Sequence, residues 1–79
     1  MKYRVKTFGI TKDILGAREV RFEMNGNTVG ELRSALSDQY PDMKSLNSLM
    51  IAINNAYADD DAILSEGDEI ALIPPVSGG

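Results

Sequence analysis

Residues 28–40 carry the clearest structural signal in the sequence. Residues 28–31 (Thr-Val-Gly-Glu) fit a capping box, in which the Thr28 hydroxyl and the Glu31 carboxylate satisfy backbone amides that begin a helix. Apolar residues then recur at helical spacing, and Pro41 disfavours helical geometry at Tyr40. The pattern predicts one amphipathic helix, which must bury its apolar stripe against another element.

Period-two alternation predicts strands before this helix, at residues 2–8 and 19–24. In the first strand the alternation places Tyr3, Val5 and Thr7 toward the core, and it leaves Phe8 on the outer, otherwise basic face. Between the two strands, Thr11 is predicted to cap a single helical turn at residues 12–15, which Gly16 ends.

A second group of strands is predicted after the helix. Residues 42–48 are predicted to be irregular or to contain a short turn, and the apolar run at residues 49–53 predicts a strand covered on both sides. Asn54-Asn55 is a tight turn, because asparagine tolerates positive φ, and Tyr57 follows in a short edge strand. Residues 69–73 are apolar on both faces, as in a central strand, and the prolines at 74 and 75 end it.

This order of elements predicts an α+β fold. One long helix covers one face of a small mixed sheet of four to five strands, and the opposite face is left bare. The 79 residues are enough for a single domain, residues 1–79, and they contain no repeat or linker. Residues 74–79 are expected to form an extended C-terminal tail.

The composition excludes many function classes. Without cysteine or histidine the chain has no thiol nucleophile, no thiolate site and no ordinary general base. A net charge of −4 argues against nucleic acid. With no apolar run near 20 residues and no signal-peptide pattern, we expect no membrane association and a cytoplasmic location.

No metal site is expected either. An EF-hand loop that started at Asp59 would place Leu64 and Ile70 where glycine and the bidentate glutamate are required. An enzyme that acts alone is the least favoured class of function, because the usual catalytic side chains are absent and the chain is small.

The last six residues carry the most specific functional signal. A terminal Gly-Gly alone is typical of a frayed end. Here Pro74 and Pro75 form a stiff spacer before Val76, Ser77, Gly78 and Gly79. Two residues without Cβ make a tail narrow enough to enter a tight channel, with the carboxylate of Gly79 at its tip.

Residues 64–70 (Leu-Ser-Glu-Gly-Asp-Glu-Ile) and 74–79 (Pro-Pro-Val-Ser-Gly-Gly) carry a family resemblance. Over its whole length the chain resembles the small subunit of molybdopterin synthase, within the β-grasp family of ubiquitin-like sulfur carriers. Weaker matches are Phe8-Gly9, Lys12-Asp13 and Gly16. The resemblance implies a ubiquitin-like β-grasp fold. Leu72 and Ile73 depart from the aromatic residues that the family often has before Pro-Pro.

The resemblance also implies a chemical role. An E1-like activating enzyme would use ATP to adenylate the Gly79 carboxylate, and a sulfurtransferase system would convert the adenylate to a thiocarboxylate. The large synthase subunit would receive the tail in its active site and pass the sulfur to a pterin precursor. A heterotetramer is implied, with two small subunits on a dimeric large one. The chain would supply a reactant and bind no cofactor of its own.

Docking is predicted to use the tail and the bare sheet face. Pro74, Pro75, Val76, Ser77 and Gly78 would enter the partner. Phe8 and Ile73 should share the outer face if the first and last strands are neighbours, with Tyr57 at its border. An exposed apolar patch usually marks an interface, and aromatic anchors are enriched there.

Three alternatives stay open. The same sulfur chemistry could serve thiamine synthesis or tRNA thiolation. The chain could instead be a ubiquitin-like modifier joined through Gly79 to lysines of other proteins. It could also be a β-grasp interaction module with an inert tail.

Overall fold

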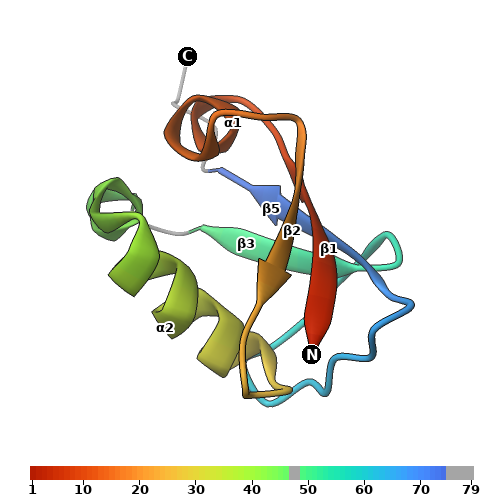
Figure 1. Ribbon diagram of the computed structural model, residues 1–79. Coiled ribbons are helices and arrows are strands. Elements are labelled where there is room, and N and C mark those ends of the chain that lie inside the picture. The colour runs from red at the N-terminus through yellow and green to blue at the C-terminus, as the bar shows by residue number, and fades with distance from the viewer. Residues whose placement is uncertain (47–48, 75–79) are drawn as a thin grey trace.

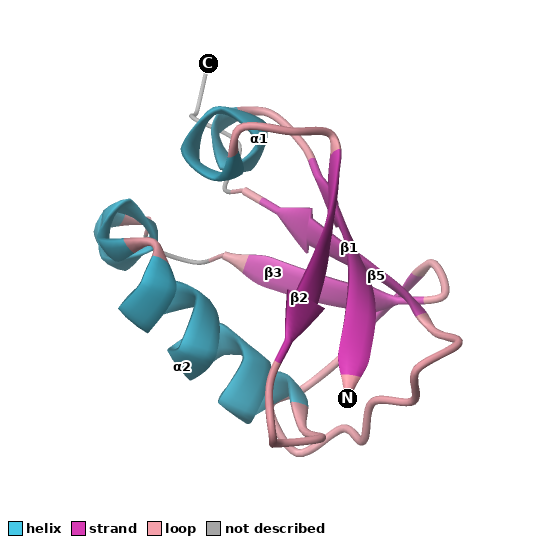
Figure 2. Cartoon of the chain, viewed as in Figure 1, coloured by secondary structure: helices cyan, strands magenta, loops and turns pink. Residues whose placement is uncertain are grey.

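The computed structural model describes residues 1–46 and 49–74, which form a sheet with a helix across one face (Figure 1). The elements in chain order are β1 (Lys2–Thr7), α1 (Ile10–Leu15), β2 (Glu19–Glu23), α2 (Val29–Gln39), the 3₁₀ helix η1 (Pro41–Ser45), β3 (Met50–Ile53), β4 (Ala56–Tyr57) and β5 (Glu69–Ile73). Strands and helices separate into two layers, with α2 as the main helix (Figure 2). The predicted α+β fold class is confirmed.

The described strands form one five-stranded sheet in the order β2-β1-β5-β3-β4. β1 and β5 are parallel, and the other neighbouring pairs are antiparallel. β5 is therefore the central strand, as its two apolar faces predict. A mixed sheet with the first and last strands side by side, covered on one face by one main helix, is the β-grasp arrangement.

The core lies between α2 and the sheet. Tyr3 and Val5 of β1 are fully buried, and Thr7 is nearly so, which confirms the predicted inner face of this strand. The fully buried apolar side chains from the other described elements are Val29, Leu32, Leu36, Ile51, Ile70 and Leu72. Thr7 is satisfied in this apolar setting because its hydroxyl donates to the carbonyl of Ala17.

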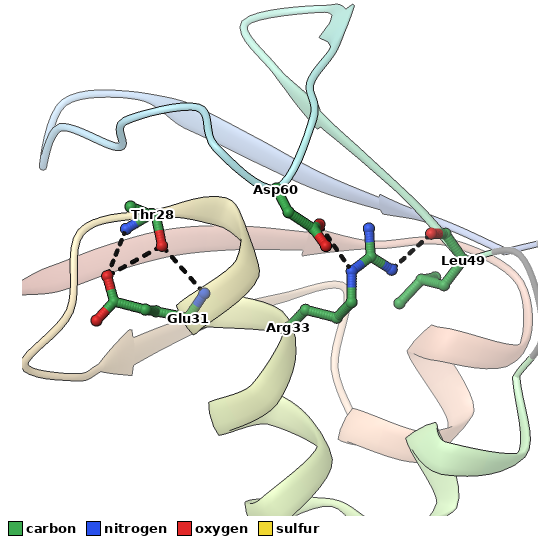
Figure 3. A network of polar contacts seen from close by, with 5 residues as sticks. All are labelled: Thr28, Glu31, Arg33, Leu49 and Asp60. Carbon is green, nitrogen blue, oxygen red and sulfur yellow. Dashed lines mark hydrogen bonds and ion pairs between the residues drawn. The ribbon is translucent and has the colours of Figure 1, made fainter.

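The predicted capping box begins α2 (Figure 3). Thr28 Oγ1 accepts from the Glu31 amide at 3.2 Å, and Glu31 Oε1 accepts from the Thr28 amide at 3.2 Å. The hydrogen bond from the Thr28 hydroxyl, followed by the one from the Asn27 amide, lowers the pKa of Glu31. Arg33 of α2 donates two hydrogen bonds to residues outside the helix. Its Nε donates to Asp60 Oδ1 at 3.2 Å, and its Nη1 donates to the Leu49 carbonyl at 2.7 Å.

The first short helix differs from the prediction. α1 begins at Ile10 rather than at residue 12, and Thr11 lies inside it, fully buried, rather than capping it. The Thr11 hydroxyl oxygen instead accepts from the Phe8 amide at 2.8 Å, and it lies 2.6 Å from the Phe8 carbonyl. Phe8 consequently falls outside β1, which ends at Thr7. Gly16 ends the helix at φ 82°, as predicted.

One further expectation is refined and one was wrong. The short turn allowed within residues 42–48 is the 3₁₀ helix η1, which begins at Pro41 and buries the Met43 side chain against the core. β3 is not covered on both sides, since Ile51 is buried but Met50 is 43% exposed. The reason is that α2 covers only the inner face, and within the described ranges no second helical layer lies on the other (Figure 2).

The β3–β4 hairpin follows its predicted turn. Asn54 and Asn55 have φ of 51° and 71°, so both central residues are left-handed, as two-residue hairpins of this twist require. Asn54 also joins the hairpin to the start of β5: its side-chain amide donates to Asp68 Oδ1 at 3.0 Å, and its oxygen accepts from the Glu69 amide at 2.9 Å. None of the helices in the described parts of the chain is long and apolar enough to cross a membrane.

Replacing Thr28 with alanine should destabilise the protein by about 1 kcal/mol, because the Glu31 amide loses its acceptor. Thr28→Ser keeps the hydroxyl and should stay within a few tenths of a kcal/mol of wild type. Urea unfolding followed by circular dichroism measures both. Equal losses in the two variants would show that the methyl group, and not the cap, is what matters.

Thr11→Val should cost about 1–3 kcal/mol, because the near-isosteric change leaves the Phe8 amide without its partner. Thr11→Ser retains the hydroxyl and serves as the control, losing only a buried methyl. The same unfolding experiment applies. A valine variant as stable as wild type would mean that the hydroxyl contributes nothing to this junction.

Candidate docking site

The sheet face opposite α2 divides into a charged half and an apolar half. On the charged half, Lys2, Arg4 and Lys6 of β1 stand opposite Glu23, Arg21 and Glu19 of β2. Cross-strand pairs of opposite charge at both ends suit a solvated surface. The apolar half lies over β5, β3 and β4.

The apolar half holds a hollow of about 280 Å³, which we call the outer hollow. It is lined by Phe8, Ala52, Asn55, Tyr57, Glu69, Ala71 and Ile73. Strand register brings these residues together, because Ala52 pairs with Ala71 on one side and with Tyr57 on the other. Between the two aromatic rings the strands carry small side chains, and this leaves room for a partner group.

Two large apolar side chains of the outer hollow lie open to solvent. Phe8 is 48% exposed and Tyr57 is 67% exposed, so neither is needed to fill the core. Their backbone positions are nevertheless held firmly, Phe8 by Thr11 and Tyr57 by the asparagine turn. Exposed aromatic rings on a fixed backbone are suited to act as anchors in an interface.

An ion pair borders the outer hollow. Lys6 Nζ lies 2.6 Å from Glu69 Oε1, and both side chains are about one third or more exposed, at 40% and 33%. The hydrogen bond from Lys6, together with its charge, lowers the pKa of Glu69. At this exposure such a pair contributes little to stability, so we regard it as a polar rim.

The end of β5, after which the tail is predicted to begin, lies at one end of this face. β5 ends at Ile73, and a Cβ placed on Gly9 would come 3.3 Å from Pro74 Cγ. Gly9 has φ 56° and ψ −129°, a conformation that residues with a side chain rarely adopt. Thr11 Oγ1 also lies 3.4 Å from the Leu72 carbonyl, so one buried hydroxyl lies between the Phe8 backbone and the end of β5.

The structure places three of the predicted docking residues, Phe8, Tyr57 and Ile73, around one hollow, and it places Pro74 beside Gly9. The predictions for Pro75, Val76, Ser77, Gly78 and Gly79 concern residues outside the described ranges. Sequence reasoning missed Ala52, Ala71, Asn55 and Glu69 as lining residues. Alternation along residues 69–73 could have placed Ala71 with Ile73, but the pairing with Ala52 depends on register.

The chain is similar in sequence to a known protein family and to proteins of known name. The sequence matches the ThiS family over residues 5–79. It is 33% identical to the molybdopterin synthase sulfur carrier subunit of Mycobacterium tuberculosis, with 100% of this chain and 99% of that protein covered. It is 37% identical to small archaeal modifier protein 1 of Haloferax volcanii, with 94% and 97% covered.

A solved structure agrees with these relatives. In the complex of subunits 1 and 2 of the molybdopterin-converting factor from Helicobacter pylori, a chain 31% identical to this one superimposes with a TM-score of 0.70, and both chains are covered completely. The ubiquitin-like β-grasp fold that the family resemblance implied is thereby confirmed. On its sequence match across residues 5–79, the chain belongs to the ThiS family.

Proposed function

We propose that the chain is the sulfur carrier subunit of a molybdopterin synthase and that the carboxylate of Gly79 carries the sulfur. The observation that carries the proposal is the full-length likeness to subunits of that name, including one 33% identical over nearly its whole length. The sequence has no cysteine or histidine, and this supports the proposal because sulfur carried on the Gly79 carboxylate needs no catalytic side chain from this chain.

The chemistry follows from the reactivity of a carboxylate. A carboxylate is a poor acceptor for a nucleophile, so an E1-like enzyme first transfers AMP to it from ATP and releases pyrophosphate. Sulfur supplied by a sulfurtransferase then displaces AMP from the acyl carbon, and Gly79 becomes a thiocarboxylate. In the active site of the large subunit the sulfur passes to the pterin precursor, and water replaces it on the acyl carbon, which restores the carboxylate. Two such deliveries complete a dithiolene.

The folded body supplies recognition. We propose that the outer hollow receives an apolar segment of the large subunit, anchored on Phe8 and Tyr57, while the tail beyond Pro74 enters the active site. Ile73 lines the hollow and directly precedes Pro74, so the two contacts are adjacent in the chain. The complex of subunits 1 and 2 from H. pylori supports a partner of this kind. We further propose a heterotetramer and a cytoplasmic location.

A second candidate function is protein modification. The 37% identity to small archaeal modifier protein 1 of H. volcanii favours it, and the same adenylated Gly79 would serve as its intermediate. Conjugation would join the acyl carbon to a lysine amine of a target instead of to sulfur. Gly79-dependent conjugates of higher mass in cells would identify this function. Sulfur delivery for thiamine synthesis or tRNA thiolation would use the same thiocarboxylate with a different receiving enzyme.

Incubation with ATP, the cognate activating enzyme and a sulfur donor should raise the intact mass by the exchange of one oxygen for sulfur. A variant that lacks Gly79 should show no shift, because the reacting carboxylate then lies on Gly78, one residue short. Mass spectrometry of the whole chain measures both. A folded wild-type protein that never gains sulfur with its cognate enzyme would contradict the carrier role.

Phe8→Ala and Tyr57→Ala should each weaken association with the large subunit by about tenfold or more, as interface anchors do. Both side chains are exposed, so the unfolding transition should stay close to that of wild type. Ile63→Ala is the matched control, since Ile63 is 61% exposed but pairs with Thr28 and does not line the hollow. Calorimetric titration measures the affinities, and an equal loss in the control would argue against the outer hollow.

A further inference from the structure

A second hollow, of about 490 Å³, shares Phe8 with the outer hollow. It lies where β1, the start of α1 and the start of β2 meet. Besides Phe8 and the backbone of Thr7, it is lined by Lys6, Gly9, Lys12, Arg18 and Glu19. We call it the basic groove, because three of these residues are cationic and one is anionic.

The basic groove is positively charged, whereas the chain as a whole is negatively charged. The protein carries a net charge of −4, yet this hollow gathers three of its eight lysine and arginine residues. Lys6 is partly neutralised by Glu69. Lys12 and Arg18 are exposed, and within residues 1–46 and 49–74 neither forms an ion pair. With Glu19 counted against these two cations, the groove keeps one net positive charge on a chain whose total charge is negative.

The backbone of the basic groove is well fixed. The Thr7 amide donates to the Arg18 carbonyl at 2.9 Å, which joins the start of the β2 segment to the end of β1. The Lys12 carbonyl accepts from the Gly16 amide at 2.8 Å, which closes the last turn of α1. The backbone positions from which Lys12 and Arg18 project are therefore fixed, and binding must still order their exposed side chains.

The position of the groove identifies its occupant. Gly9 lines the groove and approaches Pro74, so the groove adjoins the root of the tail. Phe8 lines both hollows, so a protein seated on Phe8 through the outer hollow also extends over Lys12 and Arg18. We propose that the basic groove binds aspartate or glutamate side chains of the large synthase subunit, beside the entrance through which that subunit receives the tail. This inference rests on the proposed function.

Such a contact would orient the encounter. A chain of net negative charge otherwise offers an acidic rim around the partner's channel no preferred orientation of approach. A positive groove next to the tail root supplies that preference, because it pairs with an acidic rim only when the tail faces the channel. Contacts of this kind act mainly on the association rate and weaken with salt.

Charge reversal tests the proposal. The double variant Lys12→Glu/Arg18→Glu should slow association with the large subunit by about tenfold or more at about 0.05 M salt, and the difference should shrink markedly at about 0.5 M. Lys2→Glu/Arg4→Glu is the matched control, with the same change in net charge on β1 outside the basic groove. Stopped-flow mixing of the full chain with the large subunit measures the rates. Equal slowing in both double variants would overturn the proposal.

Carbodiimide crosslinking gives a second, independent readout. This reagent joins a lysine amine to a carboxylate with which it is paired, so Lys12 should form an adduct with an aspartate or glutamate of the large subunit. Lys12→Arg should lose the adduct but keep the association rate, because the charge remains. If Lys12 forms no adduct with any acidic residue of the large subunit, and the charge-reversal variant associates at the wild-type rate, the inference is overturned. Sulfur transfer would remain intact. Failure of the wild-type chain to bind the large subunit or gain sulfur would instead overturn the proposed function.

Discussion

The parallel pairing of β1 with β5 is the constraint on which the rest of the structure depends. It places the central strand between β1 and β3, with Val5 beside Ile70 and Thr7 beside Leu72. A parallel pair needs a long crossover, and here that crossover contains α2, which packs on the inner face (Figure 1). The same pairing carries Phe8, just beyond β1, to the end of β5. Without it the docking residues and the tail root would not lie together.

One helix can cover only one face of such a sheet, and this accounts for the outer surface. Ile70 and Leu72 are fully buried under α2, whereas Ala71 and Ile73 on the same strand are only half-buried. The outer face over β5 thus keeps apolar side chains that the fold buries only in part. Exposed apolar surface of this kind is then available for a partner.

Patterns that depend on neighbouring residues were predictable, and those that depend on strand register were not. The capping box at Thr28, the asparagine turn and the central position of residues 69–73 all follow from local chemistry, and the structure confirms them. The role of Thr11 was predicted wrongly because its hydroxyl serves the preceding Phe8 instead of starting a helix.

The candidate site shows the same division. Alternation along each strand placed Phe8 and Ile73 on one face only on the condition that the first and last strands are neighbours, which the structure shows. Ala52 carries no signal of its own, because it joins the outer hollow only through its pairing with Ala71 and Tyr57. Met50 was predicted to be buried because it belongs to an apolar run. Whether a second layer of structure covers the outer face of a strand depends on the whole fold, and the local sequence does not show it.

A carrier that places its chemistry at the tip of a narrow tail must place its recognition elsewhere. Glycine offers no side chain for a partner to distinguish, so selectivity between receiving proteins depends on the surface at the tail root. That surface must also release its partner after each transfer, which limits how much apolar area it can bury. If the proposed docking surface is correct, a hollow of about 280 Å³ with two exposed aromatic rings, beside cations that act mainly on the association rate, would meet both requirements. Fast, oriented association combined with modest burial is what repeated delivery of a single sulfur atom requires.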